Sequence, residues 1–380
     1  MTKIFVIAGE ASGDRLGGLL LHALRAEAPG ATFAGVGGDR MIAEGFCSLF
    51  PISDLAVMGL APVLARLPRL LRRLNETVAA ILNDPPDCLV LIDAPDFTHR
   101  VARRIRAAAP HIPIIDYVSP TVWAWRPGRA KAMRAYVDLV LAILPFEPAA
   151  YVRLAGPRCV YVGHPLIEAL PRLARRGERE NLLLVLPGSR EAEIKRLAPI
   201  YGEAAGLLAR ARPRLEVAVP VAPQMRALVE TETARWPVSA RLLGEEEKYS
   251  AFGAARVALV TSGAATLELA LAQAPMVVAY KVACAESLLR FLVNVEHFAL
   301  PNLILERRAV PEFFQSEATP AALARALEAL LDEGPARLDQ IESLALVQEN
   351  ILAGGRSPSA RAASLILKEI DASKRRGPRR

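Results

Sequence analysis

Short, wholly apolar runs alternate along this chain with longer amphipathic stretches. In the first half, apolar positions recur at helical spacing over Arg15–Glu27 and His99–Ala109, which predicts helices there. The apolar runs around them predict strands at Ile4–Ala8, Thr32–Val36, Cys88–Ile92, Ile112–Tyr117, Leu139–Ile143 and Cys159–Val162. Apolar strands separated by helices are typical of a parallel sheet covered on both faces.

The alternation stops near Pro165 and Pro171, and the polar stretch Arg172–Glu180 is typical of a linker. It then begins again as a second series of similar length. This series predicts strands at Asn181–Leu186, Leu215–Val219, Val257–Val260 and Met276–Tyr280. It also predicts helices at Glu191–Arg212, Glu246–Ala255, Ala264–Ala272 and Thr319–Asp332.

Two such series predict an α/β protein of two doubly wound, Rossmann-like domains, in agreement with a length of 380 residues. We place the domains at residues 1–170 and 171–350, with a cleft facing the carboxyl ends of both sheets. Residues 351–380 hold a predicted helix, Ser357–Ile370, that could return to the first domain. Five of the seven residues Lys374–Arg380 are basic, and this tail either binds anionic lipid or is disordered.

Composition narrows the class of protein. Hydrophobic residues make up 52% of the chain and charged residues 23%, which suits two buried cores and argues against disorder. No apolar stretch approaches the roughly 20 residues of a spanning helix, and the N-terminus lacks a signal-peptide pattern. We therefore expect a cytoplasmic protein without a membrane span. The four cysteines lie singly, which suggests neither a zinc site nor a redox pair.

The net charge of +7 is compatible with nucleic acid, anionic lipid or phosphorylated metabolites as partners. Aromatic residues do not interleave with the basic runs, and no nucleic-acid module is visible. We therefore expect no nucleic-acid partner.

Three turns that follow predicted strands are candidates for ligand binding. The first, residues 9–14, is neither a GxGxxG motif nor a P-loop. Glu10 there suits a hydroxylated substrate better than a phosphate, because like charges repel. Ser12 or Asp14 could equally cap the following helix.

The second turn contains Gly188, Ser189 and Arg190 at the start of a predicted helix. Free N–H groups and a guanidinium at this point favour a phosphate. The alternative is that Arg190 pairs with Glu193 or Glu191.

The third turn contains Ser262 and Gly263, and Glu268 follows one helical turn later. Backbone donors here suit a diphosphate, and a carboxylate suits ribose hydroxyls. The alternative is a well-capped helix with an exposed Glu268. Together with Arg190, this turn suggests a nucleoside diphosphate bound by the second domain.

Two carboxylates, Asp93 and Asp96, follow the predicted strand Cys88–Ile92, with Pro95 between them. A carboxylate held at the end of a strand can accept a proton from an attacking hydroxyl. Asp96 is the candidate base, although it could instead cap the helix from Phe97, and Asp93 is expected to brace the turn. His99 and His164 are alternative bases, but a lone histidine is more often structural.

Two tryptophans, Trp123 and Trp125, cluster with Arg126 in a loop after a predicted strand. Aromatic rings suit a sugar or an acyl chain, and the arginine suits a phosphate. The alternative is a packed loop that shields the core.

A leucine-rich segment suggests contact with a membrane surface. Arginines at positions 66, 69, 72 and 73 interleave with it, as in interfacial helices on anionic lipid. We expect Pro62 and Pro68 to break or kink the helix. The alternative is an ordinary helix packed on the sheet. The candidate membrane-facing residues are Val57, Met58, Leu60, Val63, Leu64, Leu67, Leu70 and Leu71.

Several of these segments together resemble the lipid A disaccharide synthases. The most specific are Ile92–Phe97 (IDAPDF) and Val122–Arg126 (VWAWR). Thr98 stands where the family pattern leads us to expect asparagine. The further matching segments, in order, are residues 9–14, 56–59, 117–121, 144–147, 163–165, 186–190 and 300–303.

The resemblance implies a GT-B fold and an inverting transfer of 2,3-diacylglucosamine from its UDP conjugate. The acceptor it implies is the 6-hydroxyl of 2,3-diacylglucosamine 1-phosphate, and the products are a β-1,6 disaccharide 1-phosphate and UDP. It carries the base onto Asp96, diphosphate binding onto Arg190, and nucleotide binding onto Asn302 and Glu268. It further implies peripheral docking near Val57–Leu74 on the cytoplasmic face of a Gram-negative inner membrane.

The sequence suggests no cofactor and no metal site, because helix ends and arginine can stabilise the leaving diphosphate. The oligomeric state stays open, a homodimer included. Two competing hypotheses are a UDP-sugar 2-epimerase, which needs neither acceptor nor lipid, and a non-catalytic lipid- or nucleotide-binding protein.

Overall fold

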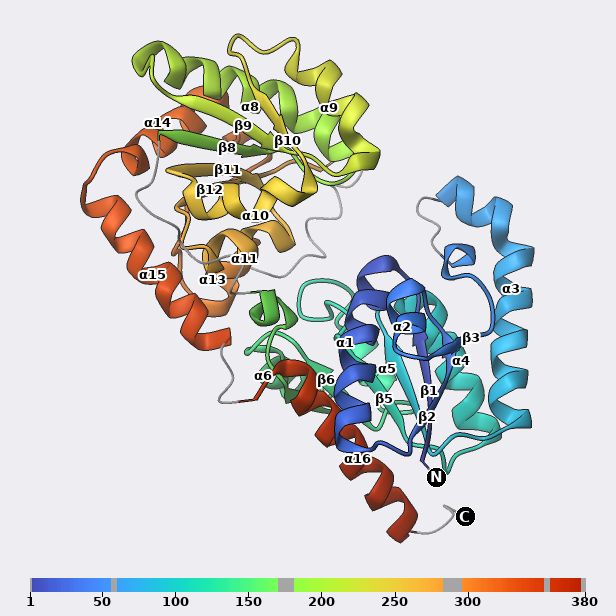
Figure 1. The fold of residues 1–380 in the computed structure, drawn as a ribbon. Coiled ribbons are helices and arrows are strands. Elements are labelled where there is room, and N and C mark those ends of the chain that lie inside the picture. The colour runs from blue at the N-terminus through green and yellow to red at the C-terminus, as the bar shows by residue number, and fades with distance from the viewer. Residues whose placement is uncertain (1, 56–59, 170–180, 283–295, 352–355, 377–380) are drawn as a thin grey trace. The chain divides into compact units, whose positions relative to one another are not determined.

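The computed structural model describes residues 2–55, 60–169, 181–282, 296–351 and 356–376. The chain divides into two compact units. Unit 1 comprises residues 1–167 together with 353–380, and unit 2 comprises residues 168–352. Figure 1 shows each unit as a sheet with helices on both of its faces.

Unit 1 is built on a seven-stranded parallel sheet with the order β3-β2-β1-β4-β5-β6-β7. The order reverses between β1 and β4, because β2 and β3 lie on one side of β1 and the later strands on the other. The strands are β1 (Lys3–Ala8), β2 (Thr32–Val36), β3 (Cys47–Ser48), β4 (Cys88–Ile92), β5 (Ile114–Tyr117), β6 (Leu139–Ala142) and β7 (Arg158–Tyr161).

Alternate residues of β1 enter two different cores, one on each face of the sheet. Ile4 and Val6 lie in a core with α1, while Phe5 and Ile7 lie in a core with α3, α4 and α5. Burial on both faces explains why residues Ile4–Ala8 of this strand are all apolar. The helical segments of unit 1 are α1 (Ala11–Glu27), α2 (Asp39–Ala43), η1 (Ile52–Asp54), α3 (Leu60–Asn83), α4 (Pro95–Ala108), α5 (Gly128–Met133), α6 (Glu147–Arg153), η2 (Pro165–Ala169) and α16 (Pro358–Arg376).

Helix α16 packs in unit 1, although the whole of unit 2 precedes it in the chain. It lies against α1, as the red and blue helices of Figure 1 show. Ala363, Ile366 and Ile370 of α16 are buried in the same core as Ile4 and Val6 of β1. The last described helix therefore completes the first unit.

The prolines do not break the helix after residue 60, because α3 is continuous from Leu60 to Asn83. Pro62 lies in the first turn, where an N–H has no helical partner in any case. Pro68 lies inside the helix, and its ring removes only one of the hydrogen bonds of a long helix.

Unit 2 has a six-stranded parallel sheet with the order β10-β9-β8-β11-β12-β13, which reverses between β8 and β11. Its strands are β8 (Leu182–Leu186), β9 (Glu216–Pro220), β10 (Arg241–Leu243), β11 (Val257–Thr261), β12 (Met276–Tyr280) and β13 (Glu312–Phe314). Its helical segments are α8 (Glu191–Ala211), η3 (Pro223–Met225), α9 (Arg226–Thr233), α10 (Glu245–Ala254), α11 (Ala264–Leu271), α13 (Leu300–Leu305), η5 (Gln315–Glu317), α14 (Pro320–Leu331) and α15 (Pro335–Ile351).

In each unit the strand order reverses between two neighbouring central strands. Turns after such strands leave a crevice at the carboxyl edge of the sheet, where α/β proteins bind ligands. The turns concerned follow β1 and β4 in unit 1, and β8 and β11 in unit 2. All the candidate turns of the sequence, residues 9–14, 93–96, 187–190 and 261–263, fall at these four places.

Candidate functional site

The turns after β1 and β4 lie against each other. A Cβ atom on Gly9 would lie 2.1 Å from the Cβ of Ala94, so only glycine fits at position 9. The Ser12 hydroxyl donates a hydrogen bond to Asp93 Oδ2 at 3.3 Å. The two turns therefore form one connected surface at the reversal point of unit 1.

The turn before α4 holds two consecutive non-glycine residues in the left-handed region, Asp93 at φ 57° and Ala94 at φ 44°. Each such residue costs on the order of 1–3 kcal/mol and persists where its surroundings enforce it. Here Asp93 Oδ1 accepts a hydrogen bond from the Ala94 N–H at 2.8 Å, so Asp93 braces the turn. The buried Thr98 hydroxyl donates to the carbonyl oxygens of Asp93 and Ala94 at 3.0 and 3.1 Å.

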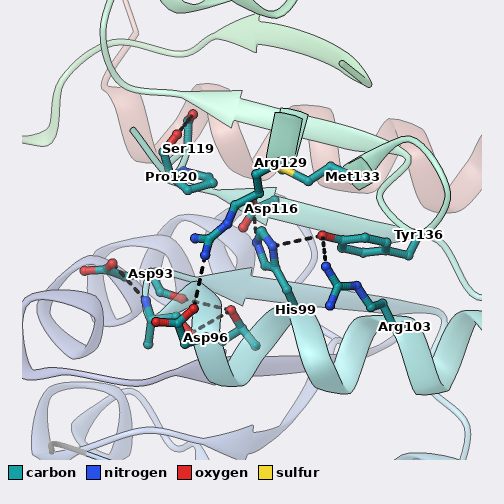
Figure 2. A network of polar contacts seen from close by, with 12 residues as sticks. Asp93, Asp96, His99, Arg103, Asp116, Ser119, Pro120, Arg129, Met133 and Tyr136 are labelled. Carbon is teal, nitrogen blue, oxygen red and sulfur yellow. Dashed lines mark hydrogen bonds and ion pairs between the residues drawn. The ribbon is translucent and has the colours of Figure 1, made fainter. Parts of the chain in front are cut away.

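Asp96 is the second residue of α4, and its side chain is 87% exposed. The helix begins at Pro95 with Ala94 as its N-cap, so the hypothesis that Asp96 caps a helix from Phe97 is wrong. Arg129 of α5 donates to Asp96 Oδ1 at 3.1 Å (Figure 2). The turn thus presents an exposed carboxylate at the carboxyl edge of the sheet, beside one guanidinium.

His99, one turn further along α4, points into the protein (Figure 2). Its Nε2 lies 3.3 Å from Asp116 Oδ2, and its Nδ1 lies 3.2 Å from the Tyr136 hydroxyl. Only 3% of His99 is exposed, so it belongs to a buried network and not to the surface that carries Asp96. His164, the other alternative base, accepts a hydrogen bond from the Leu166 N–H through Nδ1 at 3.2 Å.

The candidate residues Glu10, Ser12 and Asp14 lie at the start of α1 and make different contacts. The helix begins at Ala11 with the half-buried Glu10 as its N-cap, so neither Ser12 nor Asp14 caps it. The buried Asp14 carboxylate instead accepts hydrogen bonds from the N–H groups of Gly38, Arg40 and Met41 at 2.8–3.1 Å. Asp14 therefore holds the start of α2, while Glu10 stays at the carboxyl edge of β1.

The tryptophan loop is partly packed and partly open. Trp123 donates from Nε1 to the buried Glu147 at 3.3 Å and meets Phe146 edge-on at 5.0 Å. Trp125 is half-buried, with the exposed Arg126 guanidinium 5.6 Å from its ring. The packed-loop alternative therefore applies to Trp123, while Trp125 and Arg126 remain at the surface.

In unit 2, the turn after β8 depends on Gly188, whose φ of 123° is in the left-handed region. Glu193 of α8 accepts hydrogen bonds from the Ser189 N–H and from Arg190 Nη1, both at 3.2 Å. The pairing alternative for Arg190 is confirmed with Glu193, while Glu191 pairs with Lys195. The Arg190 side chain is 62% exposed at the N-cap of α8, so its guanidinium lies at the surface.

The turn after β11 depends on Gly263, at φ 157° and ψ −166°, a conformation essentially restricted to glycine. A Cβ atom there would meet nothing within 4 Å, so the backbone lies next to open space. The Ser262 hydroxyl donates to the Phe298 carbonyl at 2.7 Å. Glu268 is buried and pairs with Lys248 of α10 at 2.6 Å, so the alternative of an exposed Glu268 is wrong.

Asn302 has no exposed surface. Its Oδ1 accepts hydrogen bonds from the N–H groups of Ala309 and Val310 at 2.7 and 2.8 Å, and its Nδ2 donates to the Val310 carbonyl at 2.9 Å. The side chain predicted to bind the nucleotide therefore shapes the segment after α13.

The candidate membrane segment is described in part. Val57 and Met58 lie outside the described residues, as do the side chains of Leu60, Val63 and Leu64. Leu67 and Leu71 are 39% and 41% exposed, and Leu70 is half-buried. Leu74 and Ile81 are buried in the core, so the second half of α3 is an ordinary packed helix. Within the described chain, no helix is both long and apolar enough to span a membrane.

Two site residues escaped the sequence interpretation, Arg129 and Lys248. Each pairs with a predicted carboxylate from a different helix, and no local motif marks either one. In the part of the chain that the structure describes, no group of histidine, cysteine and carboxylate residues is placed to hold a metal ion.

Solved structures share this architecture. MurG of Acinetobacter baumannii aligns with a TM-score of 0.60 at 14% identity, over 97% of this chain and 100% of that one. The calicheamicin glycosyltransferase CalG4 aligns with a TM-score of 0.61 at 17% identity, over 100% of both chains. UDP-GlcNAc 2-epimerase of Neisseria meningitidis, solved with UDP-GlcNAc, gives 0.62 at 11% identity, over 98% and 100%. The two α/β units thus form the GT-B fold.

Sequence comparison identifies the family. The model of the lipid-A-disaccharide synthetase family matches residues 4–370. A lipid-A-disaccharide synthase of Nitrobacter hamburgensis is 48% identical over 386 residues, covering 99% of this chain and 97% of the relative. The synthase of Rhodospirillum centenum is 46% identical over 380 residues, covering 97% and 94%. The chain belongs to the lipid-A-disaccharide synthetase family and is a glycosyltransferase.

The carboxylate beneath the tryptophan loop gives a prediction for stability. Burial raises the pKa of Glu147 from 4.5 to about 7, although N–H donors of Leu144, Trp123 and Ile143 oppose the shift. The folded state therefore binds a proton more tightly than the unfolded state. The free energy of unfolding should fall as the pH rises from about 4.5 to about 7, by up to about 3 kcal/mol from this group.

Glu147→Gln should flatten this dependence, and urea unfolding at several pH values would measure it. Glu203→Gln, which changes an exposed glutamate of α8, is the matched control and should keep the wild-type slope. Equal slopes in wild type and Glu147→Gln would contradict the raised pKa.

Proposed function

We propose that this enzyme transfers 2,3-diacylglucosamine from UDP-2,3-diacylglucosamine to the 6-hydroxyl of 2,3-diacylglucosamine 1-phosphate. The products are the β-1,6 disaccharide 1-phosphate and UDP, with inversion at the anomeric carbon. The observation that carries the proposal is the strained Asp93–Ala94 turn, which holds the exposed Asp96 at the reversal point of a GT-B unit. Strained backbone of this kind clusters at functional sites.

Asp96 acts as the general base. As the acceptor oxygen forms its bond to the anomeric carbon, the hydroxyl proton passes to the Asp96 carboxylate. The bond from that carbon to the diphosphate oxygen breaks, and UDP takes the electron pair. The exposure of Asp96 supports this role, because a base must reach the hydroxyl directly.

Unit 2 binds the nucleotide. The turns at Gly188–Arg190 and Ser262–Gly263 offer backbone N–H groups and helix N-termini, which stabilise the growing charge of the diphosphate. Arg190 supplies a guanidinium, and Glu268 takes the ribose hydroxyls. Asn302 contributes indirectly, because its side chain is fully buried and holds the Ala309–Val310 segment.

Unit 1 binds the acceptor. Glu10 and Ser12 lie on the turn that contacts the Asp93–Ala94 turn and suit sugar hydroxyls. Trp125 suits the sugar ring or an acyl chain, and the exposed Arg126 suits the 1-phosphate. Asp93, Asp14 and Trp123 support the site from within, since their polar atoms bond to neighbouring protein groups.

The enzyme works as a peripheral protein on the cytoplasmic face of the inner membrane. Exposed Leu67 and Leu71 lie on α3 beside exposed Arg66 and Arg72. Apolar side chains that enter the interface and arginines that meet anionic headgroups are the two components of interfacial binding.

Asp96→Asn should reduce turnover by roughly a hundredfold or more, because the amide cannot accept the proton. Mass spectrometry of the disaccharide 1-phosphate, formed from both substrates in detergent, would measure the rate. Asp39→Asn is the matched control, an exposed aspartate in the first turn of α2, and should keep wild-type turnover. Equal rates for Asp96→Asn and wild type would move the base elsewhere. A wild type that binds UDP without forming product would favour the epimerase or binding-protein hypotheses.

Arg190→Ala should weaken UDP binding roughly 10- to 100-fold, because a hydrogen bond to a charged group contributes about 1.5–3 kcal/mol. Isothermal titration calorimetry with UDP would measure the affinity. Arg210→Ala, at the opposite end of α8, is the control and should bind like wild type. Unchanged affinity in Arg190→Ala would remove this residue from the diphosphate site.

Replacing Leu67 and Leu71 together by aspartate should weaken binding to anionic phosphatidylglycerol vesicles by roughly tenfold or more, because charges would then enter the interface. Vesicle co-sedimentation would measure this. Val152→Asp alters an apolar residue of α6 that is 83% exposed, and should bind like wild type. Similar losses in both variants would argue against docking through α3.

A further inference from the structure

Asp96, the candidate base, pairs with Arg129, and the position of Arg129 suits this pairing better than a contact with substrate. Arg129 contacts Oδ1 of Asp96 at 3.1 Å. The Arg129 side chain is only 22% exposed although that of Asp96 is 87% exposed, so the guanidinium is held against the protein. Arg126, three residues earlier in the chain, is exposed and suits a ligand better.

The helix that carries Arg129 is short but well fixed. Ala130 and Met133 of α5 have no exposed surface and belong to the core that α4 also enters. The Arg129 N–H donates to the Arg126 carbonyl at 2.9 Å. The backbone at Arg129 is therefore held by the buried residues that follow it in α5 and by its hydrogen bond to Arg126, which precedes it.

A buried hydrogen-bonded chain joins α4 to the segment after α5 (Figure 2). Arg103 donates to the Tyr136 hydroxyl at 3.3 Å, and this hydroxyl lies 3.2 Å from His99 Nδ1. His99 Nε2 lies 3.3 Å from the Asp116 carboxylate on β5. A carboxylate accepts hydrogen bonds, so His99 Nε2 donates to Asp116, and the four side chains form one continuous chain of polar contacts. Burial raises the pKa of Tyr136, which keeps its phenol protonated as this chain requires.

The two middle members of this chain, His99 and Tyr136, lie close in sequence to the base and to the helix that carries its partner. His99 lies three residues after Asp96 on α4, and Tyr136 lies three residues after Met133, the last residue of α5. This chain of four side chains, which we call the brace, therefore fixes the separation of the two helix segments across which Asp96 and Arg129 pair. Asp116 attaches the brace to the central sheet.

We propose that Arg129 is a positioning residue for Asp96, and that the His99–Asp116–Tyr136–Arg103 brace fixes the segment from which it acts. An exposed aspartate at the start of a helix has several rotamers of similar energy. A guanidinium on Oδ1 selects one of them and leaves Oδ2 to take the proton of the acceptor hydroxyl. A misplacement of about 1 Å at a reacting group costs up to a hundredfold in rate. The inference rests on the proposed role of Asp96 as base.

The test is a double-mutant cycle on steady-state kinetics with Arg129→Ala, Asp96→Asn and the double variant. Arg129→Ala should lower kcat roughly 10- to 100-fold, with both KM values within about twofold of wild type. The double variant should be no slower than Asp96→Asn, because Arg129 acts only through the carboxylate. Arg129→Lys should retain part of the rate, and added methylguanidinium should restore turnover to Arg129→Ala but not to Asp96→Asn.

Arg134→Ala, at the opposite end of α5, is the matched control and should keep wild-type kcat. Rescue by methylguanidinium separates lost positioning from misfolding, because the added cation cannot refold a chain. A raised KM for the acceptor with unchanged kcat would overturn the inference and make Arg129 a phosphate contact. Additive losses in the double variant would also overturn it. If wild type forms no disaccharide, the proposed function and this inference both fail; if wild type is active and the losses are additive, only the inference fails.

Discussion

Ala94 occupies the space in which a side chain on residue 9 would lie. The site of unit 1 depends on this contact, because it requires glycine at position 9. Parallel strands require crossovers, so the turns after neighbouring strands collect at one edge of the sheet. At the point where the strand order reverses, the turn after β1 and the turn after β4 contact each other at Gly9 and Ala94. A glycine after β1 lets the turn after β4 approach closely, and the close approach helps to hold Asp93 and Ala94 in left-handed conformations. The direction in which α4 presents its first residues follows from this contact.

Most strands of the two sheets could be predicted because strands buried on both faces are mainly apolar. Strands β3, β10 and β13 were missed because each has only two or three residues, too few to show a pattern. Helix α15 was missed because its buried residues include Arg337, Gln340 and Ser343 as well as apolar ones. The continuity of α3 through Pro68 was missed because tertiary packing outweighs the local cost of a proline.

The sequence predicts which turns form the candidate site, but not which residues of other helices contact them. Asp96, Arg190 and Gly263 each lie next to the end of an apolar strand, so the sequence alone marks their location. Partners that come from another helix depend on tertiary contacts, as the pairing of Asp96 with Arg129 and of Glu268 with Lys248 shows. The hydrogen bonds of Asn302 and Asp14 could not be predicted for the same reason, since they go to backbone groups of segments that fold back onto these side chains. Polar residues of these motifs therefore include ones that hold neighbouring backbone, as Asp14 and Asn302 show.

The return of α16 to unit 1 has a consequence for biosynthesis. A ribosome releases residues 168–352, which are contiguous, before it releases the helix that covers the first sheet beside α1. Unit 2 can therefore complete its core before unit 1, whose apolar face beside α1 stays uncovered until Pro358–Arg376 emerges. Premature termination within this helix would leave that face open to chaperones and proteases although every candidate site residue had already been made.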